Sequence, residues 1–382
     1  MRYLITILVL VPILAIAETT GFGLLRSEVI STPQGQVTET EWQHVDASGQ
    51  AFGLHRYQLA DAVTIATLLY LPGTNMNGVL KTADSDHNLW LYLAERGIEV
   101  YAMDYRTRYI PHDFSGDLVL MRDWSMDLFV EDAVMAVTKV QQDQPLVPMY
   151  IAGFSRGAAF AFGLAGQVEA AGLVALDGSF KKQPYESYDI GAALQRYDEE
   201  ARYASALSRR GYDARTEMMR RVISDPGSSA TNDRYQTSGD QLADILYQAW
   251  GPAVLANTRS NITPIDILAR EMLGYDWFYP TIQGIEGRSI ASQQDDPNTY
   301  IDDHFGEMTI PVLYFGSGGF GAESLLSGIH SAARSGSDDV TINVLENYGH
   351  LDVLFATDAP TEVYGVIYEW ILGHQILEPV SE

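Results

Sequence analysis

Residues 149–160 read Met149-Tyr-Ile-Ala-Gly-Phe-Ser155-Arg-Gly-Ala-Ala-Phe160 and contain the most informative motif of the chain. A β-branched and aromatic segment passes through Gly-x-Ser-x-Gly directly into an alanine-rich run, which predicts a strand that turns sharply into a helix. Gly153 and Gly157 are needed at such a turn because side chains there would collide with the neighbouring strand and helix. The turn exposes the hydroxyl of Ser155 at the edge of the sheet, so Ser155 is the candidate nucleophile.

Strands and helices alternate on both sides of this turn. Apolar and β-branched runs, typical of strands buried on both faces, recur along the chain and are separated by helical patterns. These runs lie at residues 63–71, 98–103, 149–154, 171–176, 310–315 and 340–345. Two further segments, 38–45 and 52–59, predict an antiparallel hairpin ahead of them. The order predicts an α/β protein with a mostly parallel central sheet and helices on both faces.

Residues 179–308 interrupt this alternation. Helical patterns dominate there, including one over 190–210 that Gly211 would stop and one over 263–274 with Thr263 as its cap. The sheet pattern resumes afterwards, so we expect a mostly helical cap or lid inserted into a core formed by residues 18–178 and 309–382.

The first 17 residues have the composition of a secretory signal. A short basic end, a largely apolar stretch over 4–14 and the small-residue site Ala15-Ile16-Ala17 precede Glu18. The apolar stretch is too short to span a bilayer with margin. We therefore expect cleavage after residue 17, no stable membrane span in the mature protein and a periplasmic or secreted location.

The composition excludes several classes of function. The chain has 50 acidic and 24 basic residues, a formal net charge of −26. Such a surface repels nucleic acid and anionic membranes, so no nucleic-acid partner is expected. Because the chain has no cysteine, disulfides, a thiol nucleophile and cysteine-ligated metals are excluded.

A serine nucleophile needs a base that accepts its proton, and eight histidines are candidates. Only His350 occupies a short turn between a predicted final strand and a predicted final helix, directly after Gly349. Because Ser155 lies upstream at a strand-to-helix turn, His350 is the predicted base.

Ser155 in Gly-Phe-Ser-Arg-Gly, a strand-end acid and Gly349-His350 occur in the order Ser…Asp/Glu…His. In this order the chain resembles the α/β-hydrolase superfamily, and its esterase- and lipase-like serine hydrolases in particular. The resemblance covers about residues 38–178 and 309–376, whereas 179–308 contributes nothing to it. It implies the α/β-hydrolase fold with a Ser-His-acid catalytic triad.

The acid departs from the usual pattern of the family. Most members carry it in the loop after the strand that corresponds to 310–315, where this chain has the glycine-rich segment 316–321. Asp177 ends the strand next to the Ser155 strand, which some hydrolases use for the acid. Glu323, at the predicted start of a helix, is the alternative, although a helix-dipole role would also explain it. We favour Asp177 because the carboxylate must be rigidly placed beside the histidine.

The resemblance also implies an oxyanion hole, which needs two preorganised donors. One is the backbone amide of Arg156, and the other is most simply that of Thr74 in the loop after the strand 63–71. Gly73 would let this loop approach the substrate oxygen, and Asn75 beside it is a candidate substrate contact.

Two other patterns are weaker. Gly316-Ser-Gly-Gly-Phe-Gly321 matches the dinucleotide fingerprint, but only one strand follows it, so no nucleotide-binding half-fold can form there. The acidic cluster Asp295, Asp296, Asp302 and Asp303 lacks the ordered spacing of a calcium loop, which favours a solvated loop. We therefore expect no cofactor and no metal.

These observations together predict a secreted serine hydrolase that acts on a small-molecule or lipid carboxylic ester. The tyrosine-rich insertion and its cluster Trp277-Phe278-Tyr279 suggest that the substrate has an apolar or aromatic part. The alternatives are a peptidase or amidase, a lactonase, or a non-catalytic binding protein on a hydrolase fold.

Overall fold

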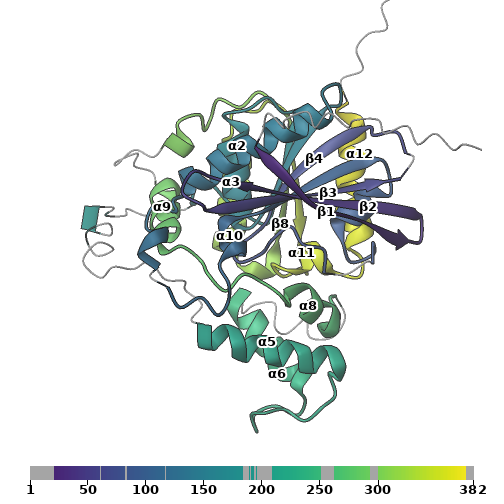
Figure 1. Ribbon diagram of the computed structural model, residues 1–382, viewed down its shortest axis with the longest axis vertical. Helices are drawn as coiled ribbons and strands as arrows, with labels where there is room; N and C mark the ends of the chain where they lie inside the picture. The colour runs from purple at the N-terminus through teal and green to yellow at the C-terminus, as the bar shows by residue number, and fades with distance from the viewer. Residues whose placement is uncertain are drawn as a thin grey trace, which may run out of the picture.

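A computed structural model describes most of the 382-residue chain, and Figure 1 shows its ribbon. The described residues are 21–60, 62–81, 84–116, 118–183, 189, 191–192, 195, 209–250, 262–292 and 300–375. The predicted signal segment 1–17, most of the predicted helix 190–210, and Asp295 and Asp296 lie outside them.

The described chain is built on a nine-stranded mixed sheet in the order β1-β2-β3-β5-β4-β6-β7-β8-β9. Its strands are β1 (Phe22–Thr32), β2 (Gly35–Val45), β3 (Ala51–Leu59), β4 (Ala66–Leu71), β5 (Ile98–Asp104), β6 (Met149–Phe154), β7 (Gly172–Leu176), β8 (Val312–Ser317) and β9 (Val340–Leu345). The pairs β1–β2, β2–β3 and β3–β5 are antiparallel, and the pairs from β5 to β9 are parallel. The predicted N-terminal hairpin and the mostly parallel sheet are thus confirmed.

Helices cover this sheet and fill the interval between β7 and β8. They are α1 (Leu89–Ala94), α2 (Met126–Asp143), α3 (Arg156–Ala165), α5 (Arg209–Ser224), α6 (Ser238–Trp250), α8 (Ile265–Met272), α9 (Thr281–Ala291), α10 (Ala322–Ala333), α11 (Asp352–Phe355) and α12 (Gly365–Gly373). Short 3₁₀ segments occur at Arg106–Tyr109, Leu118–Met121, Tyr300–Asp302 and Gly318–Phe320, and a π-helical turn at Pro360–Tyr364.

Side chains of the central strands alternate between two apolar cores. On β4, Leu68 and Tyr70 belong to the core shared with α1 and α12, whereas Leu69 and Leu71 belong to the core shared with α2 and α3. A strand alternates its side chains with a period of two, and both faces are apolar here because both are covered. Figure 1 shows α2, α3 and α10 on one side of the sheet and α12 on the other.

The order of the strands opens a crevice at the end of β4. The chain places β5 on one side of β4 and then β6 on the other. Loops that leave the carboxyl ends of these strands diverge, and ligand sites of α/β sheets lie at such reversal points. Thr74 follows β4 and Ser155 follows β6, so the topology brings the predicted oxyanion loop to the predicted nucleophile.

The helical segment between β7 and β8 has two parts in the described chain. Helices α5, α6 and α8 pack on one another through buried Met219, Val222, Leu242 and Leu268, and lie together at the bottom of Figure 1. Helix α9 lies apart from them, against α2. None of the helices within the described ranges combines the length and apolarity needed to cross a bilayer.

Two predicted helix boundaries are wrong. Gly211 does not stop a helix, since α5 begins at Arg209 and continues through it; glycine costs only about 1 kcal/mol in a helix, which packing can outweigh. Thr263 does not cap α8, because Pro264 occupies the N-cap position and no side chain accepts an N–H of the first turn. The Thr263 hydroxyl donates to Asp352 Oδ1 at 2.6 Å.

Candidate active site

Ser155 lies in a strained turn between β6 and α3. Its backbone has φ 55° and ψ −118°, a region that non-glycine residues rarely adopt. A Cβ on Gly153 would lie 2.1 Å from the carbonyl oxygen of Gly157, and one on Gly157 would lie 1.9 Å from that of Leu71. These are the collisions that the sequence predicts, so the two glycines are what allows the turn to form.

The structure brings Ser155, His350 and Asp177 together in one chain of hydrogen bonds. Ser155 Oγ lies 2.8 Å from His350 Nε2, and His350 Nδ1 lies 2.7 Å from Asp177 Oδ2. His350 and Asp177 are almost fully buried, whereas Ser155 is partly accessible. With Nδ1–H donating to the carboxylate, Nε2 is left to accept the proton of the serine hydroxyl.

Asp177 is held rigidly at the end of β7. Ser317 at the end of β8 donates its backbone N–H to Asp177 Oδ1 at 2.7 Å and its hydroxyl to Oδ2 at 2.5 Å. Asp177 itself has a φ of 45°, which turns its side chain from the strand towards His350. Glu323, the alternative acid, lies at the start of α10 with 59% of its side chain exposed and an ion pair to Lys182 at 3.2 Å. Of the two carboxylates, only Asp177 contacts the histidine.

Two aromatic rings fix the plane of the His350 ring. Phe154 stacks on it with ring centroids 4.7 Å apart, and Phe320 with centroids 3.9 Å apart. The glycine-rich loop after β8 makes this possible, because a Cβ on Gly318 would lie 2.5 Å from the carbonyl oxygen of Glu346. The segment that resembled a dinucleotide loop therefore packs against the loop that carries His350.

Thr74 and Arg156 are the predicted oxyanion donors. Both line the same cavity as Ser155. Arg156 is the first residue of α3, so its N–H has no partner within the helix and the positive end of the helix dipole faces the serine. A Cβ on Gly73 would lie 3.2 Å from Ser155 Cβ, which shows how closely this loop passes the nucleophile.

The cavity beside Ser155 has a volume of about 610 Å³, within the range of small-molecule sites. Its floor is formed by the Ser155 turn and its walls by the loops after β4 and β7, Phe320 and helix α9. Met126, Phe180, Ile290 and Phe320 give it apolar surface. We call this space the Ser155 cavity.

The other predicted substrate contacts face elsewhere. Asn75 donates its side-chain amide to the carbonyl oxygens of Asp276 at 2.8 Å and Phe278 at 3.2 Å. Trp277 and Phe278 are buried, and the Trp277 indole donates to the carbonyl of Pro111 at 2.8 Å. Tyr279 lies under the guanidinium of Arg156, 4.5 Å from the ring centroid. This group joins the helical segment to the oxyanion loop, and none of its members lines the Ser155 cavity.

A buried carboxylate that the sequence does not single out completes this junction. Asp276 accepts hydrogen bonds from Asn77 Nδ2 and from Thr107 Oγ1, each at 2.8 Å, and its backbone N–H donates to Asn75 O. Burial raises the pKa of Asp276 to about 7. We name Asn75, Asn77, Thr107 and Asp276 the loop junction, since they hold residues 74–78 in place.

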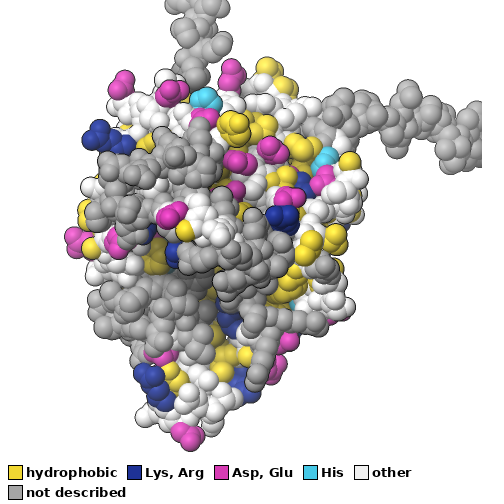
Figure 2. All heavy atoms as spheres, turned by 90° about the vertical axis from the view of Figure 1, so that its left-hand side faces the viewer, with side chains coloured by type: hydrophobic (Ala, Val, Ile, Leu, Met, Phe, Trp, Pro, Cys, Tyr) yellow, Lys and Arg dark blue, Asp and Glu magenta, His cyan; other side chains and the backbone are white. Residues whose placement is uncertain are grey.

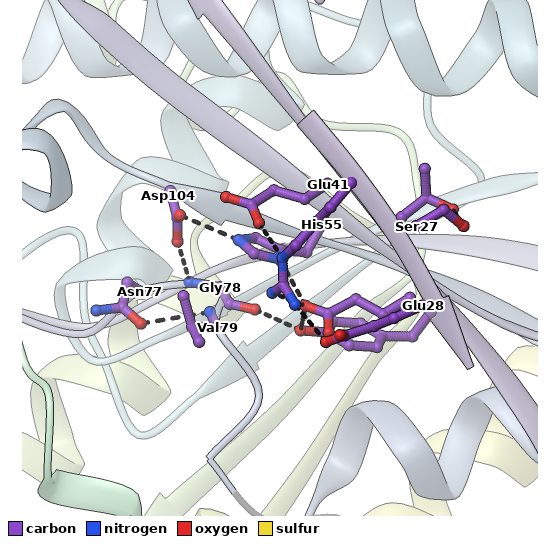
Figure 3. A network of polar contacts seen from close by, with 12 residues as sticks. Ser27, Glu28, Glu41, His55, Asn77, Gly78, Val79 and Asp104 are labelled. Atoms are coloured by element: carbon purple, nitrogen blue, oxygen red, sulfur yellow. Dashed lines mark hydrogen bonds and ion pairs between the residues drawn. The ribbon is translucent and has the colours of Figure 1, made fainter. Parts of the chain in front are cut away.

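A second buried network anchors the other end of the same loop (Figure 3). His55 lies between Glu39, 2.8 Å from Nδ1, and Asp104, 3.0 Å from Nε2, and Asp104 also accepts the backbone N–H of Gly78 at 2.7 Å. Burial lowers the pKa of His55, but the two carboxylates outweigh it and raise the pKa to about 9.

His55 also belongs to a group with metal-ligand geometry. Atoms of Glu41, His55 and Asp104 lie within 4.8 Å of one another. A metal needs a neutral imidazole with a free nitrogen, whereas both nitrogens of His55 bond to carboxylates that favour the protonated ring. The group therefore fits an ion-pair network better than a metal site.

Known structures share this architecture. No protein-family model matches the chain, and no curated protein sequence matches it. A candidate lipase from Sulfolobus solfataricus superimposes with a TM-score of 0.75 at 21% identity, covering 93% of this chain and 99% of that one. A thermostable carboxyl esterase from Bacillus coagulans gives 0.52 at 16% identity, covering 88% and 98%. A monoglyceride lipase variant from Saccharomyces cerevisiae gives 0.50 at 12%, covering 86% and 94%. The chain has the α/β-hydrolase fold that its sequence predicts.

Proposed function

We propose that this protein is a serine hydrolase that cleaves carboxylic esters through an acyl-enzyme. The observation that carries the proposal is the hydrogen-bonded chain from Ser155 through His350 to Asp177. A partly accessible hydroxyl, a buried imidazole and a buried carboxylate in this order are the parts that acyl transfer requires.

In the first half of the reaction, Ser155 Oγ attacks the acyl carbon while His350 Nε2 takes the hydroxyl proton. Asp177 keeps the proton of the ring on Nδ1 and stabilises the imidazolium that forms. Because Ser317 donates two hydrogen bonds to Asp177, the carboxylate does not need to move when the charge on the ring changes.

The developing oxyanion faces the N–H groups of Thr74 and Arg156 and the amino end of α3. A preorganised donor of this kind contributes roughly 3–4 kcal/mol to transition-state stabilisation. His350 then returns its proton to the alcohol, and in the second half the same groups activate a water that hydrolyses the acyl-enzyme.

Ester hydrolysis is favoured over other acyl transfers by the likeness to solved structures. Two of the solved structures that superimpose on this chain are described as a candidate lipase and a carboxyl esterase. Apolar surface from Phe180, Ile290 and Phe320 in the Ser155 cavity suits the apolar part of a small ester.

Two remaining predictions extend the proposal. The chain is exported with cleavage of its signal segment, and residues 179–308 act as a cap over the site.

The test is a panel of para-nitrophenyl esters of increasing acyl length, run beside para-nitroanilides with the same acyl groups. The proposal expects turnover of the esters, with no turnover by Ser155→Ala, and far slower turnover of the anilides. Faster cleavage of the anilides would assign the triad to a peptidase or amidase. No turnover of either series by folded protein would contradict the proposal.

A further inference from the structure

A buried carboxylate close to His350 in the sequence has no part in the proposed triad. Acidic side chains are common on the surface of this protein, and Figure 2 shows them spread over the described parts of one face. Asp352 differs from them because its exposed fraction is 0%. Burying a carboxylate is costly unless hydrogen bonds compensate it, so the partners of Asp352 indicate what it supports.

Asp352 closes the turn that carries His350. Its Oδ2 accepts the backbone N–H of Gly349 at 2.7 Å, and its own backbone N–H donates to the carbonyl of Gly349 at 3.1 Å. Because Gly349 directly precedes His350, both hydrogen bonds fix the backbone at the base. Asp352 is also the first residue of α11, whose Val353 and Leu354 are buried in the core. The carboxylate and apolar packing therefore hold the turn together.

The other oxygen of Asp352 is bound by the helical segment between β7 and β8. Thr263, which is buried just before α8, donates its hydroxyl to Asp352 Oδ1 at 2.6 Å across 89 positions of the chain. Beside it, the carbonyl of Ile262 accepts the backbone N–H of Thr357 at 2.8 Å. The segment ahead of α8 is thus joined to both ends of α11, the short helix that follows the turn of the base.

The opposite end of α8 holds the oxyanion loop. Asp276, which follows α8, belongs to the loop junction with Asn75 and Asn77. Helix α8 therefore lies between the turn that carries His350 and the loop that carries Thr74. A displacement of α8 would act on the proposed base and on a proposed oxyanion donor together.

The charge of Asp352 also acts on the proposed triad. Burial raises the pKa of Asp352, the hydrogen bonds that it accepts oppose this effect, and the charges of Asp358 and Asp177 raise the pKa further. Asp352 and Asp177 are therefore within electrostatic range of each other. Since Asp177 contacts the ring of His350, an ionised Asp352 also favours a positive charge on that ring.

We propose that Asp352 is a positioning residue for His350, and that Thr263 extends this support to the helical segment. The inference rests on the proposed ester hydrolysis and adds a residue outside the triad to it. Asp352 keeps His350 Nε2 directed at Ser155 Oγ, and adds its charge to that of Asp177 when the ring takes up the proton. The helical segment then supports the base as well as covering the site.

Asp352→Asn separates the charge from the hydrogen bonds. The asparagine oxygen can still accept the N–H of Gly349, and its NH₂ can donate to the Thr263 hydroxyl, which can also act as an acceptor. With a neutral para-nitrophenyl ester, the acidic limb of the kcat/KM profile should shift to lower pH by roughly 0.5 unit or more, because the protonated ring loses a nearby anion. Since Asp352 does not line the Ser155 cavity, kcat should fall several-fold while KM stays nearly constant.

Asp358→Asn is the matched control for the charge. It removes an equal charge from the same part of the chain, but Asp358 is exposed and accepts a hydrogen bond from Tyr348 instead of Gly349. Solvent and salt screen an exposed charge, so the pH profile should keep its position. A shift as large as that in Asp352→Asn would show a general field effect and overturn the assignment.

Thr263→Val tests the link to the helical segment. It keeps the shape of the side chain and removes the hydroxyl, which leaves Asp352 Oδ1 without its donor. We expect kcat to fall about fivefold or more at a nearly constant KM, and Thr263→Ser to restore it. These two variants also carry the test if Asp352→Asn does not fold.

Thermal unfolding identifies the variants that are folded and can be compared. If Thr263→Val and Asp352→Asn unfold at a lower temperature but keep the wild-type kcat and pH profile, the two residues are structural only and the inference is wrong, while the proposed hydrolase stands. If the wild-type protein cleaves no ester at all, the proposed function itself fails.

Discussion

Replacing Asp177 by Asn exchanges one carboxylate oxygen for an NH₂ group and should move the ring proton of His350 from Nδ1 to Nε2. Asp177 Oδ1 accepts the backbone N–H of Ser317 at 2.7 Å, so the asparagine carbonyl must stay there and its NH₂ must take the Oδ2 position beside His350 Nδ1. A donor at this place makes Nδ1 an acceptor, which moves the ring proton to Nε2. The nitrogen that faces Ser155 could then no longer accept the hydroxyl proton.

The size of the effect follows from the geometry. Unit charges 2.7 Å apart, the distance from His350 Nδ1 to Asp177 Oδ2, attract by roughly 6 kcal/mol at an effective dielectric constant of about 20. Most of this stabilisation of the imidazolium is lost in Asp177→Asn. We expect kcat to fall on the order of 10⁴-fold, the loss that a reversed histidine tautomer produces in a Ser-His-Asp triad.

The assay is steady-state hydrolysis of a neutral para-nitrophenyl ester, with thermal unfolding as the check on folding. Glu323→Gln is the matched control, because Glu323 is exposed and does not contact His350, and its kcat should stay within about twofold of wild type. Near-native turnover by Asp177→Asn, or a collapse in Glu323→Gln, would refute the assignment of the acid.

Two further predictions test the networks that hold the oxyanion loop. Asn75→Ala removes two hydrogen bonds worth about 1 kcal/mol each and places alanine at a φ of 63°, which costs roughly 1 kcal/mol more. The midpoint temperature of thermal unfolding and kcat should both fall, and Asn75→Gly should recover only the part of the loss that is due to the backbone. An unchanged kcat in both variants would show that the loop junction does not support catalysis. The pKa of His55 is raised from 6.5 to about 9, so protonated His55 contributes roughly 3 kcal/mol to the free energy of unfolding. This contribution is complete below pH 6.5 and is lost as the pH rises towards 9. The free energy of unfolding, measured with denaturant between pH 6.5 and about 9, should fall with rising pH in the wild type but not in His55→Gln. The same dependence on pH in both proteins would contradict this role of His55.

The residues of the proposed triad could be predicted because their signals are local. Gly153 and Gly157 mark a turn that few other backbones require, and His350 stands between a final strand and a final helix. Asp177 could be favoured over Glu323 because the carboxyl ends of neighbouring parallel strands meet at one edge, as β7 and β6 do here.

The supporting residues could not be predicted, because their roles depend on contacts between distant segments. Ser317 contacts Asp177 across 140 residues of chain, and no local pattern distinguishes it from other loop serines. Asn75 has a positive φ and turns its side chain to a segment about 200 positions away. The sequence also does not predict strand β1, because it is an edge strand whose Leu24, Leu25 and Val29 are exposed and it shows no apolar alternation.

The residues that line the Ser155 cavity could not be predicted from the sequence for the same reason. The aromatic residues 277–279 are predicted to contact the substrate because pockets are often aromatic. In the structure the Trp277 indole donates to the carbonyl of Pro111, the Phe278 carbonyl accepts from Asn75, and Tyr279 lies under the Arg156 guanidinium. Arg288 and Gly284 look ordinary in the sequence, and become a cavity face only when α9 is placed against α2.

The most direct test of the central claim is covalent labelling with a fluorophosphonate, which reacts with activated serines. The account predicts one adduct on the folded protein, located by mass spectrometry on the peptide that contains Ser155. The adduct should be absent in Ser155→Ala and form much more slowly in His350→Ala. A folded wild-type protein that takes up no label, or an adduct on another serine that persists in Ser155→Ala, would contradict the claim that Ser155 is the nucleophile.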